Sequence, residues 1–172
     1  EGFARNVISA SFNGTTVETT TPLTADGSLI LYTWNDENGK KAFWHSTSHV
    51  MAQVLEQMYP GVKLTLGPAI SNGFYYDIDF EDQKITEADF KKIEDSILEI
   101  SRGKHEFKLR PVSKADALEL YKDNVYKTEM ITNLEDGTIT FCDHDTFTDL
   151  CRGGHIPNTG IIKAVKIMSV AG

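Results

Sequence analysis

The stretch "WHSTSHVMAQVLEQM", residues 44–58, has the pattern of a helix with two different faces. His45 and His49 are four residues apart, just over one helical turn, so their imidazoles should share a face. Pro60-Gly61 then ends the helix. Most of the apolar side chains form another stripe that should pack inward: Val50, Val54, Leu55 and Met58. The paired histidines therefore need a partner elsewhere in the chain.

A second pair of potential ligands lies in "CRGGH", residues 151–155. Three imidazoles and one thiolate, from His45, His49, Cys151 and His155, would suit a tetrahedral zinc ion. Taken alone, two helical histidines are more often a partly exposed surface pair, and a lone cysteine is more often a small semi-buried thiol. Together the two pairs favour a shared site, and zinc as its occupant stays open.

The residues around this second pair could bind an anion. Gly153 and Gly154 let the backbone approach a ligand, so their N–H groups could hold an oxyanion or a phosphate. Arg152 can fork onto a phosphate or a carboxylate. Asp149 could orient a histidine or accept a substrate amine, or it could be an ordinary turn carboxylate.

The two remaining histidines, His105 and His144, match neither pair, and we interpret them as surface residues.

The beginning of the chain has a different character from the rest. Strand-type residues flank Asn13-Gly14, a strong signal for a two-residue hairpin. A further strand is expected at residues 28–34, and "NDENGKK", residues 35–41, is interpreted as a linker or turn. We therefore divide the chain into a small β-rich unit, residues 1–40, and a larger unit, residues 41–172.

The larger unit mixes strands with helices. Strands 62–70 and 73–80 should be joined by a turn that contains Asn72-Gly73. Thr86 can cap a helix that Gly103 ends. Further strands are expected at 106–112, 125–131, 138–145 and 161–172, and a short helix at 113–121. Because regular β-α-β alternation is missing, the pattern predicts the α+β class.

Three consecutive aromatic residues follow the Asn72-Gly73 turn. Strand alternation should direct Phe74 and Tyr76 to one side and Tyr75 to the other. One side could offer a nucleotide base a surface for stacking, although packing in the core is the commoner role of such rings.

Composition narrows the possible partners. The chain has 172 residues and a net charge of −8, so a broad basic surface for nucleic acid is not expected. If the chain handles RNA, it should do so through a local pocket. Two cysteines are too few for a disulfide framework, and no apolar run is long enough to span a membrane. We expect a reduced, cytoplasmic location.

Four motifs together closely resemble the threonyl-tRNA synthetase family: "HSTSHVMAQ" (45–53), "GPAISNGFYYDIDF" (67–80), "YK" (126–127) and "DLCRGGHIPNTG" (149–160). They look like the editing domain of that family, which has relatives in the alanyl-tRNA synthetases. Residues 4–34 are similar to the back half of the family's N-terminal TGS domain, a ubiquitin-like β-grasp fold.

The resemblance implies an N-terminal fragment of a longer enzyme, beginning inside the TGS domain and stopping before the class II aminoacylation core. The ATP, Mg²⁺ and zinc of that family would then belong to the missing core, and no cofactor is expected in this chain. The implied partner is the aminoacylated end of threonine tRNA, with no DNA and no membrane. We expect a monomeric fragment of a homodimeric parent.

The resemblance also implies a reaction, hydrolysis of the ester of serine wrongly attached to threonine tRNA. A synthetic site distinguishes a missing methyl-sized group by only about 10–200-fold, so a second, smaller site is needed. We expect this pocket to be open to water, with Lys127 reaching in from a strand. The residues expected in catalysis are His45, His49, Lys127, Asp149, Cys151 and His155; those expected to bind substrate are Tyr76, Arg152, Gly153 and Gly154.

A zinc ion is not expected in the pocket, because the ammonium group of Lys127 would disfavour a dication. Two other functions fit the same motifs. One is a free-standing, zinc-dependent alanyl-tRNA deacylase, against which the TGS-like segment argues. The other is a non-catalytic binding module that zinc holds together through His45, His49, Cys151 and His155.

Overall fold

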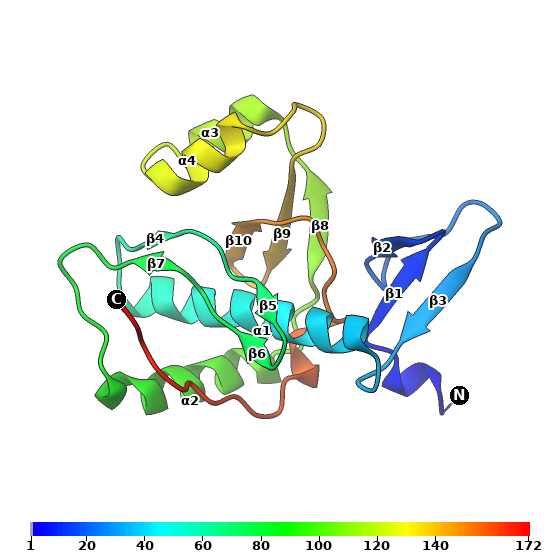
Figure 1. Cartoon of the computed structure of the whole chain (residues 1–172), viewed down its shortest axis with the longest axis horizontal. Helices are drawn as coiled ribbons and strands as arrows, with labels where there is room; N and C mark the ends of the chain where they lie inside the picture. The colour runs from blue at the N-terminus through cyan, green and yellow to red at the C-terminus, as the bar shows by residue number, and fades with distance from the viewer. Residues whose placement is uncertain (1) are drawn as a thin grey trace.

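The computed structural model describes residues 2–172 and confirms the α+β class. In Figure 1, α1 crosses the middle of the molecule, with one three-stranded sheet at its N-terminal end and a second sheet above it. The α-helices are α1 (Glu37–Met58), α2 (Glu87–Arg102), α3 (Lys114–Leu120) and α4 (Val125–Thr132). The strands are β1 (Ser9–Phe12), β2 (Thr15–Val17), β3 (Leu29–Tyr32), β4 (Lys63–Leu64), β5 (Ala69–Ile70), β6 (Gly73–Phe74), β7 (Ile78–Asp79), β8 (Lys108–Pro111), β9 (Thr140–His144) and β10 (Phe147–Leu150). Two short 3-10 helices span Ala4–Asn6 and Thr159–Ile161.

The first sheet has the antiparallel order β2-β1-β3. Asn13 and Gly14 both have positive φ, 48° and 79°, which is the backbone of the tight hairpin turn between β1 and β2. The predicted hairpin and the strand after it are therefore confirmed. Ile8 and Ala42 belong to one buried cluster, so the sheet unit packs against α1.

Helix α1 begins at Glu37, so the prediction of a linker at residues 35–41 was wrong. Gly39 was interpreted as a turn residue, but its role is close packing: a Cβ there would lie 1.9 Å from the carbonyl oxygen of Thr33. Asp36 accepts hydrogen bonds from the backbone N–H and hydroxyl of Thr33, which fixes the entry to the helix. The proposed division between residues 40 and 41 therefore falls inside α1, and it stays a prediction.

The core lies between α1 and α2. Val50, Val54 and Leu55 from α1 pack with Ile93 and Ile97 from α2 in one buried cluster, as the apolar stripe predicted. Thr86 and Asp89 form the capping box of α2.

Strand pairs β4–β7 and β5–β6 lie beside this core, and the second predicted hairpin is confirmed at β5–β6. The second sheet has the antiparallel order β10-β9-β8.

Two predicted strands were wrong. Residues 125–131 form helix α4, because the side chain of Asn124 caps it by accepting from Lys127 N, and Lys127 and Ile131 form its buried face. Residues 161–172 lie along α2 without a strand partner after the 3-10 helix (Figure 1). Val165 and Ile167 pack against the core, so the apolar residues of this segment serve packing rather than a sheet.

Within the described residues, no helix combines the length and the apolar character that crossing a bilayer requires.

Candidate functional site

The structure brings together the two pairs of histidine and cysteine residues that the sequence singled out. His45 and His49 lie on one face of α1, with ring centroids 4.7 Å apart. Cys151 and His155 lie in the loop after β10. His45 Nε2 is 3.1 Å from Cys151 Sγ, and His155 Nε2 is 3.4 Å from the same sulfur. We call these residues the His/Cys cluster; one ligand atom from each lies within 4.8 Å of the others.

The loop that carries Cys151 and His155 is held against α1. Gly153 and Gly154 have φ values of 95° and 89°, a region that glycine adopts without strain. The backbone N–H of Gly153 donates to Cys151 Sγ at 3.3 Å, and the N–H of Ile156 donates to Ser46 Oγ of α1 at 2.9 Å. The glycines therefore allow a tight turn that aims the thiol and the imidazole back at the helix.

A buried network of charged and polar groups lies beside the cluster. Lys127 Nζ donates to Asp149 Oδ1 at 2.5 Å, and the hydroxyl of Tyr76 donates to Asp149 Oδ2 at 2.5 Å. Asp149 Oδ2 also lies 3.9 Å from His49 Nδ1, which connects the network to the cluster. Lys127 reaches this position from helix α4, so the prediction that it lies on a strand was wrong.

The site is more enclosed than the sequence suggested. His49, Lys127 and Asp149 are only 2%, 2% and 3% exposed. For these residues, the expectation of a pocket open to water was wrong. Arg152 is exposed, whereas Gly153 and Gly154 are half-buried, so of the expected substrate-binding residues only Tyr76 contacts the network directly.

The surroundings set opposite charges on Cys151 and His155. Burial alone would raise the pKa of the Cys151 thiol, but its electrostatic interaction with the His49 ring and hydrogen bonds with His155 and His45 lower its pKa well below 9.0. Burial would lower the pKa of His155, but hydrogen bonds with Cys142, Cys151 and Glu18 raise that pKa well above 6.5. The two side chains thus favour a thiolate and imidazolium pair.

The pKa of His49 on α1 shifts in the opposite direction from that of His155. Burial lowers the pKa of His49, which favours the neutral imidazole. Among the described residues, His49 Nδ1 is a buried nitrogen without a hydrogen-bond partner. This nitrogen therefore has an unused hydrogen-bonding capacity, 3.9 Å from Asp149 Oδ2.

Sequence reasoning missed two residues at the site. His144 was interpreted as a surface residue, but it is buried, with Nε2 2.9 Å from Gln53 Oε1 and its ring 6.5 Å from that of His49. Strand alternation could have found it, because His144 lies two residues after the buried Cys142 on β9. Glu18, which follows β2, contacts the loop through His155, and no local sequence signal points to it.

His105 is half-buried at the surface, and its Nδ1 lies 3.6 Å from Asp145 Oδ1. It lies outside the His/Cys cluster.

An aromatic groove adjoins the site. A cavity of about 1750 Å³ runs beside α1 and is lined by Trp44, Phe74, Tyr75, Tyr76 and Tyr126, among others. Tyr76 belongs both to this groove and to the network around Asp149. The groove therefore reaches the network around Asp149 through Tyr76, whereas none of the four residues of the His/Cys cluster lines it.

The sequence of the chain is similar to those of known proteins. Residues 138–172 match the family model described as "Threonyl and Alanyl tRNA synthetase second additional domain". The chain is 86% identical over 172 residues to a threonine–tRNA ligase of Flavobacterium johnsoniae and 83% identical to one of Flavobacterium psychrophilum. It is 50% identical over 171 residues to one of Parabacteroides distasonis. These matches cover 98–100% of this chain but 26% of each relative, so the chain spans about a quarter of their length.

The fold, the loop after β10 and the matched family model define the class: the chain carries the second additional domain found in threonyl- and alanyl-tRNA synthetases. Within that class, the identity along the whole chain is to threonine–tRNA ligases. The chain belongs to the threonyl-tRNA synthetase family and corresponds to its N-terminal region.

Proposed function

We propose that this chain edits mischarged tRNA by hydrolysing the ester that joins serine to the terminal ribose of threonine tRNA. The observation that carries the proposal is the His/Cys cluster, in which His45 is half-buried and the other three residues are buried, with the Lys127–Asp149 pair beside it. The chain that carries it is 86% identical to a threonine–tRNA ligase. Serine lacks one methyl group of threonine, so a binding site alone separates the two by only about 10–200-fold. An enclosed second site can admit serine and exclude the larger residue.

The chemistry of the site suits attack by water on an ester. Burial lowers the pKa of His49 and so favours its neutral form, and its Nδ1 has no hydrogen-bond partner among the described residues, so we assign it to accept a proton from the attacking water. The water oxygen then bonds to the ester carbon, and the bond to the ribose oxygen breaks when that oxygen gains a proton. The side chain of His45, with Nε2 3.1 Å from Cys151 Sγ, lies where it can help to position these groups. The N–H groups of Gly153 and Gly154 already donate to Cys151 Sγ and to Glu18 Oε1, so their part is to shape the loop.

We propose a role for Asp149 other than accepting the amino group of the substrate. Both of its carboxylate oxygens already accept hydrogen bonds, from Lys127 and from Tyr76. We therefore assign Asp149 to holding Lys127 and Tyr76 in place, rather than to binding the serine amino group. The terminal adenosine of the tRNA would stack in the aromatic groove, next to Tyr76.

The donor set of the cluster also fits a zinc ion. His45, His49, Cys151 and His155 would hold it, and a zinc ion supplies Lewis-acid polarisation of a bound oxygen. Four protein ligands form a closed, structural type of site, whereas catalytic zinc sites keep one position open. The electrostatic argument against zinc is weaker than expected, because Asp149 neutralises Lys127. Our proposal keeps a metal-free editing site and leaves the non-catalytic zinc module as its rival.

The proposal extends to the longer protein that the relatives represent. We propose that it is a homodimeric, cytoplasmic class II ligase that uses ATP, Mg²⁺ and zinc outside the region covered by this chain. The two cysteines, Cys142 and Cys151, are free thiols in the structure, in keeping with a reducing compartment.

A deacylation assay tests the proposed function. We expect this chain to hydrolyse seryl-tRNA faster than threonyl-tRNA, and His49→Ala to remove that activity. Equal rates on the two esters would contradict a size-selective second site. Stoichiometric zinc by elemental analysis, with folding lost on chelation and no hydrolysis, would favour the zinc-bound binding module instead.

A further inference from the structure

The side chain of Glu18 enters the candidate site from the other sheet. Glu18 directly follows β2, but its carboxylate lies against the loop formed by residues 151–155. Oε1 accepts from the backbone N–H of Gly154 at 2.7 Å, and Oε2 accepts from the backbone N–H of His155 at 3.3 Å. Oε1 also lies 3.1 Å from His155 Nδ1, and the residue is only 8% exposed.

These contacts fix the imidazole of His155. Its Nδ1 faces the Glu18 carboxylate, so its Nε2 points to Cys151 Sγ at 3.4 Å. A carboxylate on one ring nitrogen sets the orientation of the ring and the position of its proton. Cys142 Sγ, 3.6 Å from the same Nδ1, is a much weaker hydrogen-bond partner than a carboxylate. Glu18 is therefore the dominant partner of His155 on that side.

The loop is shaped around this carboxylate. A Cβ at Gly153 would lie 2.8 Å from Glu18 Oε1 and 3.1 Å from Leu109 Cδ2, in a backbone conformation that side chains rarely adopt. The glycine thus leaves room for Glu18, in addition to allowing the turn. A carboxylate that only capped the two backbone N–H groups would not need the third contact, to a side chain of the cluster.

We infer that Glu18 is a positioning residue of the candidate site, which holds His155 and its loop in the geometry that ester hydrolysis requires. The inference rests on the proposed function. It makes the N-terminal sheet unit part of the site, although Glu18 lies 137 positions before His155 in the sequence. If the N-terminal sheet moved away from the loop, the rate of ester hydrolysis would fall, although no residue that contacts the substrate would have been changed.

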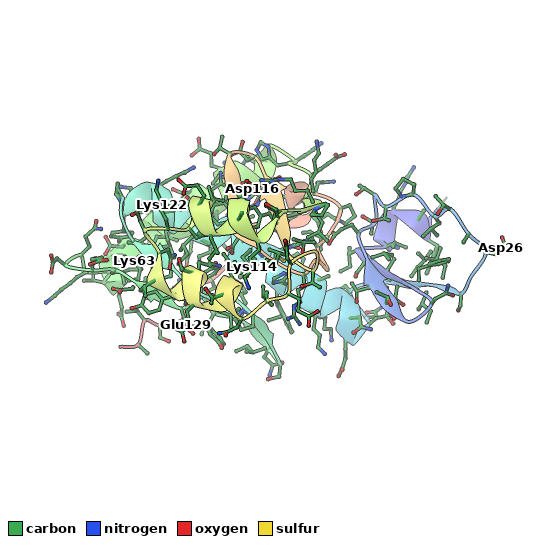
Figure 2. All side chains as sticks on the ribbon, turned by 90° about the horizontal axis from the view of Figure 1, so that it is seen from above. Asp26, Lys63, Lys114, Asp116, Lys122 and Glu129 are labelled. Carbon is green, nitrogen blue, oxygen red and sulfur yellow. The ribbon has the colours of Figure 1, made fainter. Side chains whose placement is uncertain are left out.

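The test compares two variants that each remove one negative charge, Glu18→Gln and Asp26→Asn. Asp26 is exposed in the same unit, and Figure 2 shows it at the far end of the molecule from the helices. In Glu18→Gln the new amide N–H₂ group would face the N–H of His155. We expect kcat for seryl-tRNA to fall about tenfold to hundredfold with KM nearly unchanged, and Asp26→Asn to match the unsubstituted chain.

Two further measurements separate positioning from folding. Nitrogen-15 NMR of the histidine side chains should show that the His155 signals shift in Glu18→Gln and stay unchanged in Asp26→Asn. Glu18→Asp keeps the charge with a shorter reach, and we expect it to recover part of the lost kcat. It also serves as the probe if Glu18→Gln does not fold.

The possible failures are distinguishable. If the unsubstituted chain hydrolyses the seryl ester and Glu18→Gln folds and matches it in kcat, the positioning role is wrong and editing stands. If the unsubstituted chain does not hydrolyse the ester, the proposed function and this inference both fail. A loss of kcat in Glu18→Gln without any shift of the His155 signals would also overturn the role assigned to Glu18.

Discussion

Lys127 is a buried ammonium group whose charge is balanced by Asp149 at 2.5 Å. Removing one member of a buried ion pair leaves the other charge desolvated and unpaired, which typically costs about 3–5 kcal/mol. We therefore expect Lys127→Ala to lower the free energy of unfolding by that amount as well as to slow seryl-ester hydrolysis. Urea unfolding measures the first effect, and deacylation of seryl-tRNA measures the second.

Two controls test whether the loss of stability in Lys127→Ala comes from breaking a buried ion pair. Lys122→Ala removes an exposed lysine that pairs with Glu119, and we expect it to change stability little. Combining Lys127→Ala with Asp149→Asn should cost less than the sum of the single changes, because the second change removes the stranded charge. Additive costs in this double-mutant cycle would show that the two groups do not depend on each other.

At the scale of single residues, the sequence predicted groups that share a local spacing and missed those that meet only in the fold. His45 and His49 share a helical face, and Cys151 and His155 share a loop, so their patterns were visible. Glu18 carries no such pattern, because its partner lies on another element. The burial of Lys127 could not be predicted either, because nothing in the sequence indicates that this lysine is only 2% exposed.

At the scale of elements, α2 provides packing rather than chemistry. Ile97 is 0% exposed and packs in the cluster formed with α1. Ile97→Ala should cost about 2–5 kcal/mol of stability through lost burial and the cavity that remains. While the fold persists, kcat for the seryl ester should change little, because the helix contributes no group to the His/Cys cluster.

Glu99→Ala on the exposed side of the same helix is the matched control for this prediction, and its unfolding midpoint should stay near that of the unsubstituted chain. Chemical denaturation and the deacylation rate are measured on all three proteins. If Ile97→Ala is fully folded in the assay and still loses most of its kcat, then α2 influences the geometry of the His/Cys cluster.

Elements with short-range signals were predicted well, and those decided by distant contacts were not. The Asn13-Gly14 hairpin and the Thr86 cap depend on neighbouring residues, and both are present. Residues 125–131 combine β-branched and helix-forming residues in a short run. The side chain of Asn124 caps the segment and so favours a helix. Residues 161–172 were predicted as a strand and form none, because pairing requires a free strand edge that the sequence of the segment cannot reveal.

At the scale of the whole molecule, charge and site together describe how tRNA would be recognised. The chain carries 17 basic and 25 acidic residues, so its surface as a whole repels a phosphate backbone. If the chain edits tRNA as proposed, recognition should come from the aromatic groove and the His/Cys cluster, both of which are local. The terminal nucleotides of the tRNA are the part of the substrate that such a site can contact.

This picture predicts how hydrolysis depends on substrate length and salt. A seryl ester of a short oligonucleotide ending in CCA should be hydrolysed with kcat/KM within about tenfold of that for whole seryl-tRNA, because few phosphates outside the terminus are bound. Between 50 and 200 mM salt, a protein with about six to ten phosphate contacts loses about 10³–10⁵ in affinity, whereas about two contacts to a single strand cost less than about tenfold. We expect the smaller loss here.

Arg152 provides the internal check, because it is an exposed basic side chain in the loop of the cluster. If it binds one phosphate, Arg152→Ala should lower kcat/KM and reduce the slope of log kcat/KM against log salt by about one. Lys122→Ala, in the turn between α3 and α4, removes an exposed lysine that pairs with Glu119 and should leave the slope unchanged. A loss of a thousandfold with salt, together with a strong preference for whole tRNA, would instead require an extended phosphate-binding surface, which the acidic composition of the chain argues against.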